Sequence, residues 1–272
     1  MKMLNAIRME LFRLRKSLSF YVILFILILV TLRTVFILNE NLSFLEHKTE
    51  LSQKQITKAE KDLSRILSLD MDSLITNGNK ITLSDVLPAV FSPMFLVISA
   101  IFMVLYVSHE NNSGFIKNIV NSVGRKWYLI LSKVSAFSLY LFMVFVLQLI
   151  IAGIGLSIGL ENFSLKISWE LFGYLALLYL LYIAFAVFIV MVTTALKNTA
   201  FSVIIIMLDC FGIFAAIDPL KELSKYFISI NILSFSAKST SATCIRMLFV
   251  SLLSILIYNA MSYYIIEKRD IS

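Results

Sequence analysis

Long apolar runs alternate with shorter polar segments along the chain, and this alternation predicts its architecture. Six of the runs are close to twenty residues long, the length at which an α-helix crosses the hydrocarbon core of a bilayer. The predicted membrane-spanning helices cover residues 20–38, 88–107, 134–158, 171–193, 200–217 and 244–266. We therefore expect an all-α polytopic membrane protein, in which residues 1–272 form a single transmembrane domain with six spans.

The segment 1–19, ahead of the first span, has the spacing of an amphipathic helix. Its apolar residues recur at steps of three and four in one narrow stripe formed by Leu4, Ile7, Leu11, Leu14 and Leu18. Cationic residues border the stripe or lie on the opposite side, namely Lys2, Arg8, Arg13, Arg15 and Lys16. This predicts an interfacial helix whose cations face lipid headgroups or a partner. A plain cationic anchor is the alternative, and it places the segment in the same compartment.

Two polar regions between spans are expected on the outer side of the membrane. Residues 39–87 keep helical spacing in part, which predicts a helical external loop that extends the first span. This loop returns at Thr82, which can cap the next helix. Residues 218–243 are too short and too polar for two crossings. We expect them to form partial helices, as a re-entrant external hairpin between the fifth and sixth spans.

A few polar or charged side chains fall inside the predicted spans: Arg33, Gln148, Asp209 and Asn259. Asp209 lies ten residues beyond Thr199, hence roughly 15 Å deep at the helical rise. An ionised carboxylate at that depth costs about 2.5–3.5 kcal/mol. We expect these residues in a substrate pathway or in contacts between helices, with Asn259 as a candidate partner of Asp209. Arg33 either extends to the nearer membrane surface or faces substrate.

The third predicted span carries a small-residue motif near its outer end. Gly155 and Gly159 are four residues apart, a spacing that lets two helices approach closely in a membrane. We expect the pair to mark a helix contact.

The segment 109–133 is polar and basic, and it lies between two long apolar runs. It carries Lys117, Arg125, Lys126 and Lys133 against one acid, Glu110. Short loops rich in lysine and arginine stay on the cytoplasmic side of membrane proteins. Glycines at both ends of an amphipathic stretch predict a short surface helix with flexible ends. A solvated connector is the alternative interpretation.

The order of residues in this segment resembles the first cytoplasmic loop of ABC exporter permeases of the second type. The matching residues are Glu110, Gly114 to Asn118, the Gly124-Arg125 turn, and Ser132-Lys133 before the next span. Phe115 replaces the usual threonine, and no proline precedes the Gly124-Arg125 turn. The charged C-terminal segment, Glu267-Lys268-Arg269-Asp270, is similar to the ending of many members of this family.

The resemblance implies a permease subunit that pairs with a second copy or a homologue and docks two separate ATPase subunits. ATP and Mg would bind to those partners, and no cofactor is expected in this chain. The docking residues implied by the match are Glu110, Gly114, Phe115, Lys117, Asn118, Gly124 and Arg125, supported by Arg8, Arg13 and Arg15 of the N-terminal helix. The substrate class would be an amphipathic peptide, drug or lipid.

Composition and charge agree with a membrane protein. Of the 272 residues, 59% are hydrophobic and 15% are charged, whereas a soluble domain is close to half apolar and one-quarter charged. The net charge of +7 suits anionic lipids or an acidic protein face rather than nucleic acid. An even number of spans, with most short-loop cations at the termini and in segment 109–133, predicts a plasma-membrane protein with both termini in the cytoplasm.

Catalytic motifs are missing from the sequence. There is no phosphate-binding Gly-x4-Gly-Lys-Ser/Thr loop, no His-Glu-x-x-His and no Gly-x-Ser-x-Gly, and the two cysteines match neither a disulfide framework nor a metal site. We expect no enzymatic activity in this chain. Two other functions stay open: a non-transporting immunity or sensor subunit, and an ion-coupled secondary transporter that uses Asp209.

Overall fold

The computed structural model describes residues 2–46, 81–91, 93–112, 127–160, 163–164, 168–196, 198–216, 224–236 and 239–268. The long helices are α2 (Leu18–Glu46), α6 (Pro93–Asn112), α8 (Trp127–Gly159), α9 (Trp169–Leu196) and α13 (Ser241–Lys268). The shorter helical elements are α1 (Lys2–Lys16), α5 (Leu83–Val90), α10 (Thr199–Cys210), η2 (Ile213–Ala216), η3 (Ser224–Tyr226) and α12 (Ile228–Ser234). The strands β1 (Ile81–Thr82) and β2 (Phe163–Ser164) form one short parallel pair.

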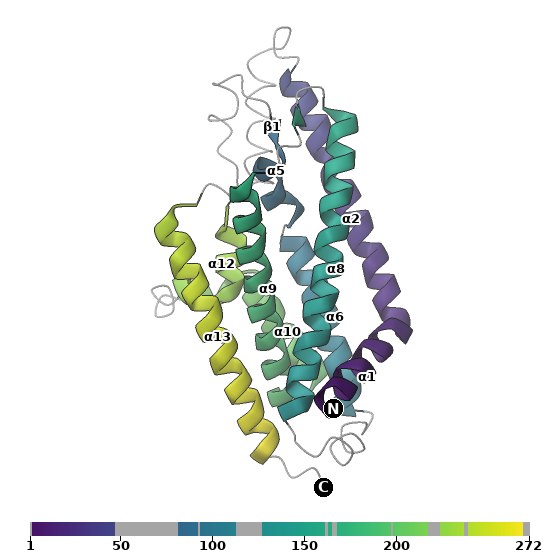
Figure 1. The fold of residues 1–272 in the computed structure, drawn as a ribbon, viewed down its shortest axis with the longest axis vertical. Coiled ribbons are helices and arrows are strands. Elements are labelled where there is room, and N and C mark those ends of the chain that lie inside the picture. Colours follow the sequence, from purple (N-terminus) through teal and green to yellow (C-terminus); the bar gives the residue numbers. More distant parts are fainter. Residues whose placement is uncertain are drawn as a thin grey trace.

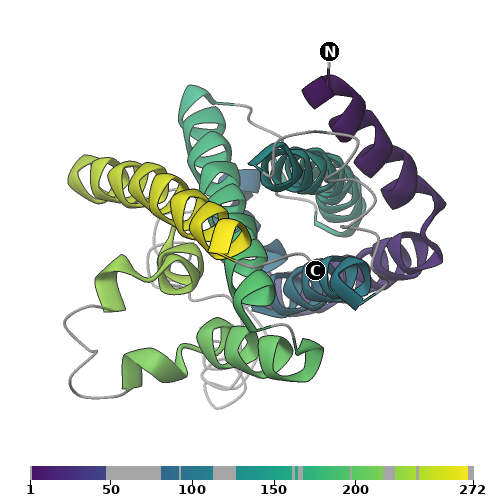
Figure 2. The same ribbon diagram turned by 90° about the horizontal axis from the view of Figure 1, so that it is seen from below.

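The long helices run side by side along the long axis of the molecule (Figure 1). Helix α1 lies at one end, which we call the α1 end, and α5 with β1 lies towards the other, the β1 end. The last turn of α13 also lies at the α1 end. Seen along this axis, α1 and α13 occupy opposite sides of the bundle (Figure 2).

Four helices in the described part of the chain are long and apolar enough to cross a membrane. They are α8, α9, α13 and the Leu18–Glu40 part of α2. Helices α5 and α6 are bent by 47° at a short break and together qualify as a fifth span. The expected all-helical architecture is therefore confirmed, with the two-residue strand pair as its only departure among the described residues. Four or five candidate membrane-spanning helices are found within the described ranges, against the six predicted.

The fifth predicted span, over residues 200–217, is not one continuous helix. Helix α10 ends at Cys210 after 12 residues, or about 18 Å, well short of a bilayer core about 30 Å thick. Gly212 has a φ of 67°, a left-handed conformation that ends helices and suits glycine. The 3-10 helix η2 follows it. The predicted C-terminal boundary of this span was wrong because the sequence stays apolar across the break.

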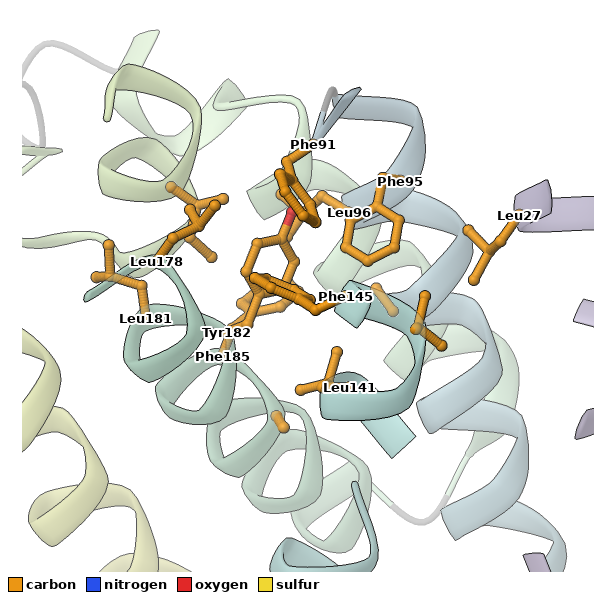
Figure 3. Packing of buried hydrophobic residues seen from close by; sticks show 14 of the residues in the cluster. Leu27, Phe91, Phe95, Leu96, Leu141, Phe145, Leu178, Leu181, Tyr182 and Phe185 are labelled. Atoms are coloured by element: carbon orange, nitrogen blue, oxygen red, sulfur yellow. The ribbon is translucent and has the colours of Figure 1, made fainter. Parts of the chain in front are cut away.

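Aromatic packing around α9 forms the centre of the bundle. In α9, 61% of the apolar stretch is buried, compared with 17% in α13. Tyr182 of α9 lies with Phe91, Phe95 and Phe145 in one cluster (Figure 3). The Phe91 and Phe145 ring centroids are 4.3 Å apart, and Tyr182 meets Phe145 edge-on at 5.2 Å. Such contacts stabilise a core beyond the area they bury.

The small-residue motif of the third span packs against α2, as the sequence predicts. A Cβ atom added at Gly155 would lie 2.6 Å from Cγ1 of Val35, and one added at Gly159 would overlap the Asn39 side chain. The Asn39 amide donates a hydrogen bond to the Gly155 carbonyl oxygen at 3.0 Å. The close approach of α2 and α8 is therefore made by side chains of α2 against the glycine backbone of α8.

The predicted external loop over residues 39–87 is described only at its two ends. Helix α2 continues to Glu46, beyond the predicted end of the first span. Thr82 caps α5, as expected: the Asp85 carboxylate accepts hydrogen bonds from the Thr82 backbone N–H at 3.1 Å and from its hydroxyl at 2.6 Å. Residues 47–80, which carry the rest of this prediction, lie outside the described residues.

Candidate functional site

The predicted docking loop is described only where it joins the helices. Glu110 lies in the last turn of α6, and α8 resumes at Trp127. Both of these helix ends lie at the α1 end (Figure 1). The remaining predicted docking residues of the loop lie outside the described residues: Gly114, Phe115, Lys117, Asn118, Gly124 and Arg125.

Helix α1 forms as predicted, but its buried face overlaps only one edge of the apolar stripe. The side chains that face the bundle are Ala6, Glu10 and Leu14, with 2%, 0% and 5% of their surface exposed. At 3.6 residues per turn, this face lies roughly 80° around the helix from the centre of the apolar stripe. Leu4, at the other edge of the stripe, is exposed. Leu18 is exposed too, but it is the first residue of α2. Helix α1 therefore has one side packed against protein and one exposed side.

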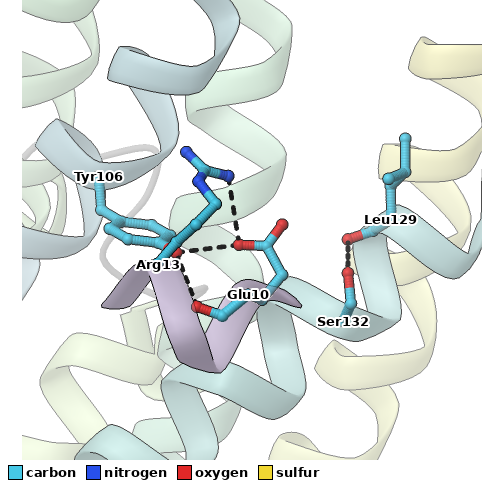
Figure 4. A network of polar contacts seen from close by, with 5 residues as sticks. All are labelled: Glu10, Arg13, Tyr106, Leu129 and Ser132. Atoms are coloured by element: carbon cyan, nitrogen blue, oxygen red, sulfur yellow. Dashed lines mark hydrogen bonds and ion pairs between the residues drawn. The ribbon is translucent and has the colours of Figure 1, made fainter. Parts of the chain in front are cut away.

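A polar joint connects α1 to α6. The Tyr106 hydroxyl lies 2.9 Å from Oε2 of Glu10 and 3.2 Å from the Glu10 carbonyl oxygen, and it can donate to either (Figure 4). Nη1 of Arg13 lies 3.6 Å from Oε2 of Glu10, and the guanidinium carbon is 5.6 Å from the centre of the Tyr106 ring. These three residues, Glu10, Arg13 and Tyr106, are called the elbow joint below.

Burial dominates the electrostatics of the elbow joint. It raises the pKa of Glu10 above its ordinary value of 4.5, while Arg13 and the Tyr106 hydroxyl act in the opposite direction. Oε1 of Glu10 is buried and makes no hydrogen bond with the described residues. A buried carboxylate with one unsatisfied oxygen is expensive to ionise. The joint therefore holds its proton more readily than a solvated glutamate does.

Neither Glu10 nor Tyr106 was identified as a site residue from the sequence. Glu10 is the only acid in residues 1–19, and this isolation was the available signal. Arg13 was placed on the polar side of α1, whereas the structure makes it half-buried beside Glu10. Arg8 and Arg15 are exposed, as predicted.

A cavity of about 590 Å³ opens beside the elbow joint. It lies where α1 turns into α2, and its wall includes residues of α6 and Thr199, the first residue of α10. Arg13 and Tyr106 line it directly, together with Lys16 and His109. The cavity therefore lies between the N-terminal helix and the end of α6. The predicted docking loop begins at this end of α6.

Asp209 of α10 is a buried acid, with 8% of its surface exposed. It lies one residue before the end of α10, where Ser229 of α12 and Tyr258 of α13 face it. The Ser229 hydroxyl does not reach standard hydrogen-bond geometry with it. Among the described residues, Asp209 has no ion pair.

The other predicted residues of the spans do not gather around Asp209. The Asn259 amide donates to the Ile255 carbonyl oxygen of its own helix at 2.8 Å, so the proposed pairing with Asp209 is not seen. Gln148 is buried in α8, with Oε1 unpaired among the described residues. Arg33 is exposed on α2, as expected for a side chain that extends to the membrane surface.

A scan against protein-family models and searches of curated proteins and of solved structures found no match. The functional assignment accordingly rests on the sequence motifs and on the geometry of the α1 end.

Proposed function

We propose that this chain is the permease subunit of an ATP-driven ABC exporter of the second type. It moves an amphipathic peptide, drug or lipid out of the cytoplasm or the inner leaflet, and two separate ATPase subunits bind the ATP and Mg. A second permease copy or a homologue completes the complex. The observation that carries the proposal is the elbow joint, which ties an interfacial helix to the base of α6 beside the loop that resembles the family.

The arrangement of the helices supports six crossings with both termini in the cytoplasm. Thr199 lines the cavity at the α1 end, and α10 rises from there. Helix α13 ends at the α1 end and begins towards the β1 end (Figure 1). The chain between residues 199 and 241 then makes the fifth crossing in pieces, with α10 as its first half. The short helices η3 and α12 fall within residues 218–243, the segment that we propose as the re-entrant hairpin.

The proposed mechanism transmits force through the α1 end. Closure of the ATPases pushes on the loop between α6 and α8, whose docking residues include Lys117 and Arg125. Tyr106 lies one helical turn before Glu110, so a displacement of the loop reaches the elbow joint through α6. Because Glu10 and Tyr106 hold α1 to α6, α1 moves with α6 and the spans tilt together.

A test of this proposal is copurification with candidate ATPases. The charge-reversal variant Lys117→Glu/Arg125→Glu should lose both copurification and ATP-dependent export, because lysine and arginine pair with acids on the partner. Lys166→Glu/Lys221→Glu is the matched control, since both residues are predicted on the outer side. Intact copurification and export in the first variant would refute the docking role.

An ion-coupled secondary transporter is the second candidate, and Asp209 is the observation that favours it. A buried acid at the break between α10 and η2, without an ion pair among the described residues, suits a proton-carrying group. Export by the Asp209→Asn variant, measured across pH, tests whether Asp209 carries the proton. Export that stays unchanged across pH removes proton coupling by this residue, whereas loss of a pH-dependent component supports it.

A further inference from the structure

The cavity beside the elbow joint has a cationic wall. The cations Arg13 and Lys16 line it, together with the His109 imidazole and the hydroxyl-bearing residues Ser17, Ser108 and Thr199. None of the described residues in its wall is acidic. Glu10 contributes no exposed surface, because its carboxylate faces Tyr106 and Arg13 inside the protein. Cations and hydroxyl groups around an open cavity suit a phosphate group.

Lys16 is the cation of this cavity that no acid among the described residues offsets. Arg13 shares its charge with Glu10, whereas Lys16 forms no ion pair with the described residues. Its ammonium group lies 4.7 Å from the centre of the Phe12 ring, an arrangement that leaves its hydrogen-bond donors available to a ligand. Lys16 is exposed, so a ligand reaches it without a change in the fold.

Exposed apolar residues lie near the cavity. They include Leu18, the residue at which the candidate membrane span of α2 begins. Leu18 and Tyr21 of α2 are 78% and 50% exposed, and Leu105 of α6 is 45% exposed and also lines the cavity. The candidate span of α2 begins at Leu18. The cavity therefore lies where phospholipid headgroups meet acyl chains. A free phosphate would use only the polar wall, but a phospholipid uses both surfaces.

We propose that this cavity binds the phosphate headgroup of an anionic phospholipid from the leaflet at the α1 end. Lys16 and the neighbouring hydroxyl groups hold the phosphate, and the acyl chains lie against Leu18, Tyr21 and Leu105. The bound lipid fills the gap between α1 and α6 next to the elbow joint, and so holds the interfacial helix in place. This inference requires neither an ATPase nor transport, so it can fail independently of the proposed function.

The test measures lipid binding to the purified full-length chain in a neutral detergent, by native mass spectrometry and by thermal unfolding. The probes are phosphatidylglycerol, phosphatidylcholine with the same acyl chains, and soluble glycerol phosphate. The variants are Lys16→Gln, Lys16→Arg and the control Arg8→Gln, which removes an exposed cation of α1 that does not line the cavity.

We expect phosphatidylglycerol to bind more tightly than phosphatidylcholine. Lys16→Gln should weaken phosphatidylglycerol binding about fivefold, as expected for one cation at an anionic headgroup. Lys16→Arg and Arg8→Gln should bind it as the unaltered chain does. Equal binding of the two lipids, or an equal loss in Lys16→Gln and Arg8→Gln, overturns the proposal. Glycerol phosphate that binds as tightly as phosphatidylglycerol also overturns the proposal, because the cavity would then be a site for a soluble phosphate and not for a phospholipid.

Discussion

The Tyr106 hydroxyl and the Glu10 carboxylate meet at 2.9 Å, although they are 96 positions apart in the chain. Glu10 belongs to α1 and Tyr106 to α6, so their contact ties α1 to α6. Both side chains are buried. A hydrogen bond to a buried carboxylate is stronger than one between neutral groups. The elbow joint is therefore the contact whose loss should alter the α1 end most directly.

Removal of the Tyr106 hydroxyl tests this directly. Tyr106→Phe leaves the Glu10 carboxylate without its hydroxyl donor, which should lower the stability of the docked α1 by about 1–3 kcal/mol. Hydrogen exchange in α1 should become faster, and the melting temperature should fall. Tyr21→Phe is the control, since Tyr21 is half exposed on α2. Equal exchange rates in the two variants would mean that packing alone holds α1.

The raised pKa of Glu10 predicts a pH dependence with a definite sign. The folded state holds the Glu10 proton more tightly than the unfolded state, so this contribution to stability is present at low pH. It is lost as the pH rises from 4.5 through the higher pKa of the folded protein. The variant Glu10→Gln has no such ionisation cost, and its amide oxygen can still accept from Tyr106.

Glu10→Gln should accordingly be more stable than the unaltered chain at neutral pH, and this advantage should shrink on acidification. Melting temperatures of both proteins from about pH 4 to about pH 8 measure the difference. The comparison between the two curves cancels the titration of the other acids. An advantage that grows on acidification would contradict the assigned direction of the pKa shift.

The contact of α2 with α8 predicts a graded set of glycine substitutions. Gly159→Ala displaces the Asn39 side chain and its hydrogen bond to Gly155, and Gly155→Ala presses on the stiff Val35 side chain. Each should lower the free energy of unfolding by about 1–3 kcal/mol. Gly173→Ala on α9 meets nothing within 4 Å, so it should be neutral. Thermal unfolding in detergent ranks the three. A loss as large at Gly173 would contradict close packing as the cause, because alanine otherwise favours a helix over glycine.

The proposed topology can be checked by the sidedness of single cysteines. In a Cys210→Ser/Cys244→Ser background, Lys268→Cys should react with a membrane-impermeant reagent only after the cells are opened. Ser241→Cys should react in intact cells, because α13 runs from the β1 end to the α1 end. Both residues are exposed. Labelling of Lys268→Cys from outside would reverse the proposed orientation, and labelling of both from one side would show that α13 does not cross.

Several local features were predictable because they depend on residues close together in the chain. The cap at Thr82 needs only Asp85 three positions later. The Gly155 and Gly159 pair predicts a close helix contact but not the partner helix. In the structure the partner is α2, through Val35 and Asn39. The break at Gly212 was missed because apolar residues continue on both sides of it, and hydrophobicity alone does not report a left-handed backbone conformation.

The sequence by itself determined the class of the protein, because apolar runs near twenty residues have few alternatives to a membrane helix. It also determined that α1 is an amphipathic helix carrying cations. Only the tertiary structure decided which face of α1 is buried, that a carboxylate lies at its centre, and that Tyr106 is its partner. The physical reason is that helical periodicity distinguishes the faces of a helix only by their hydrophobicity. Burial of an acid depends on a hydrogen-bond donor, and here that donor is far away in the chain.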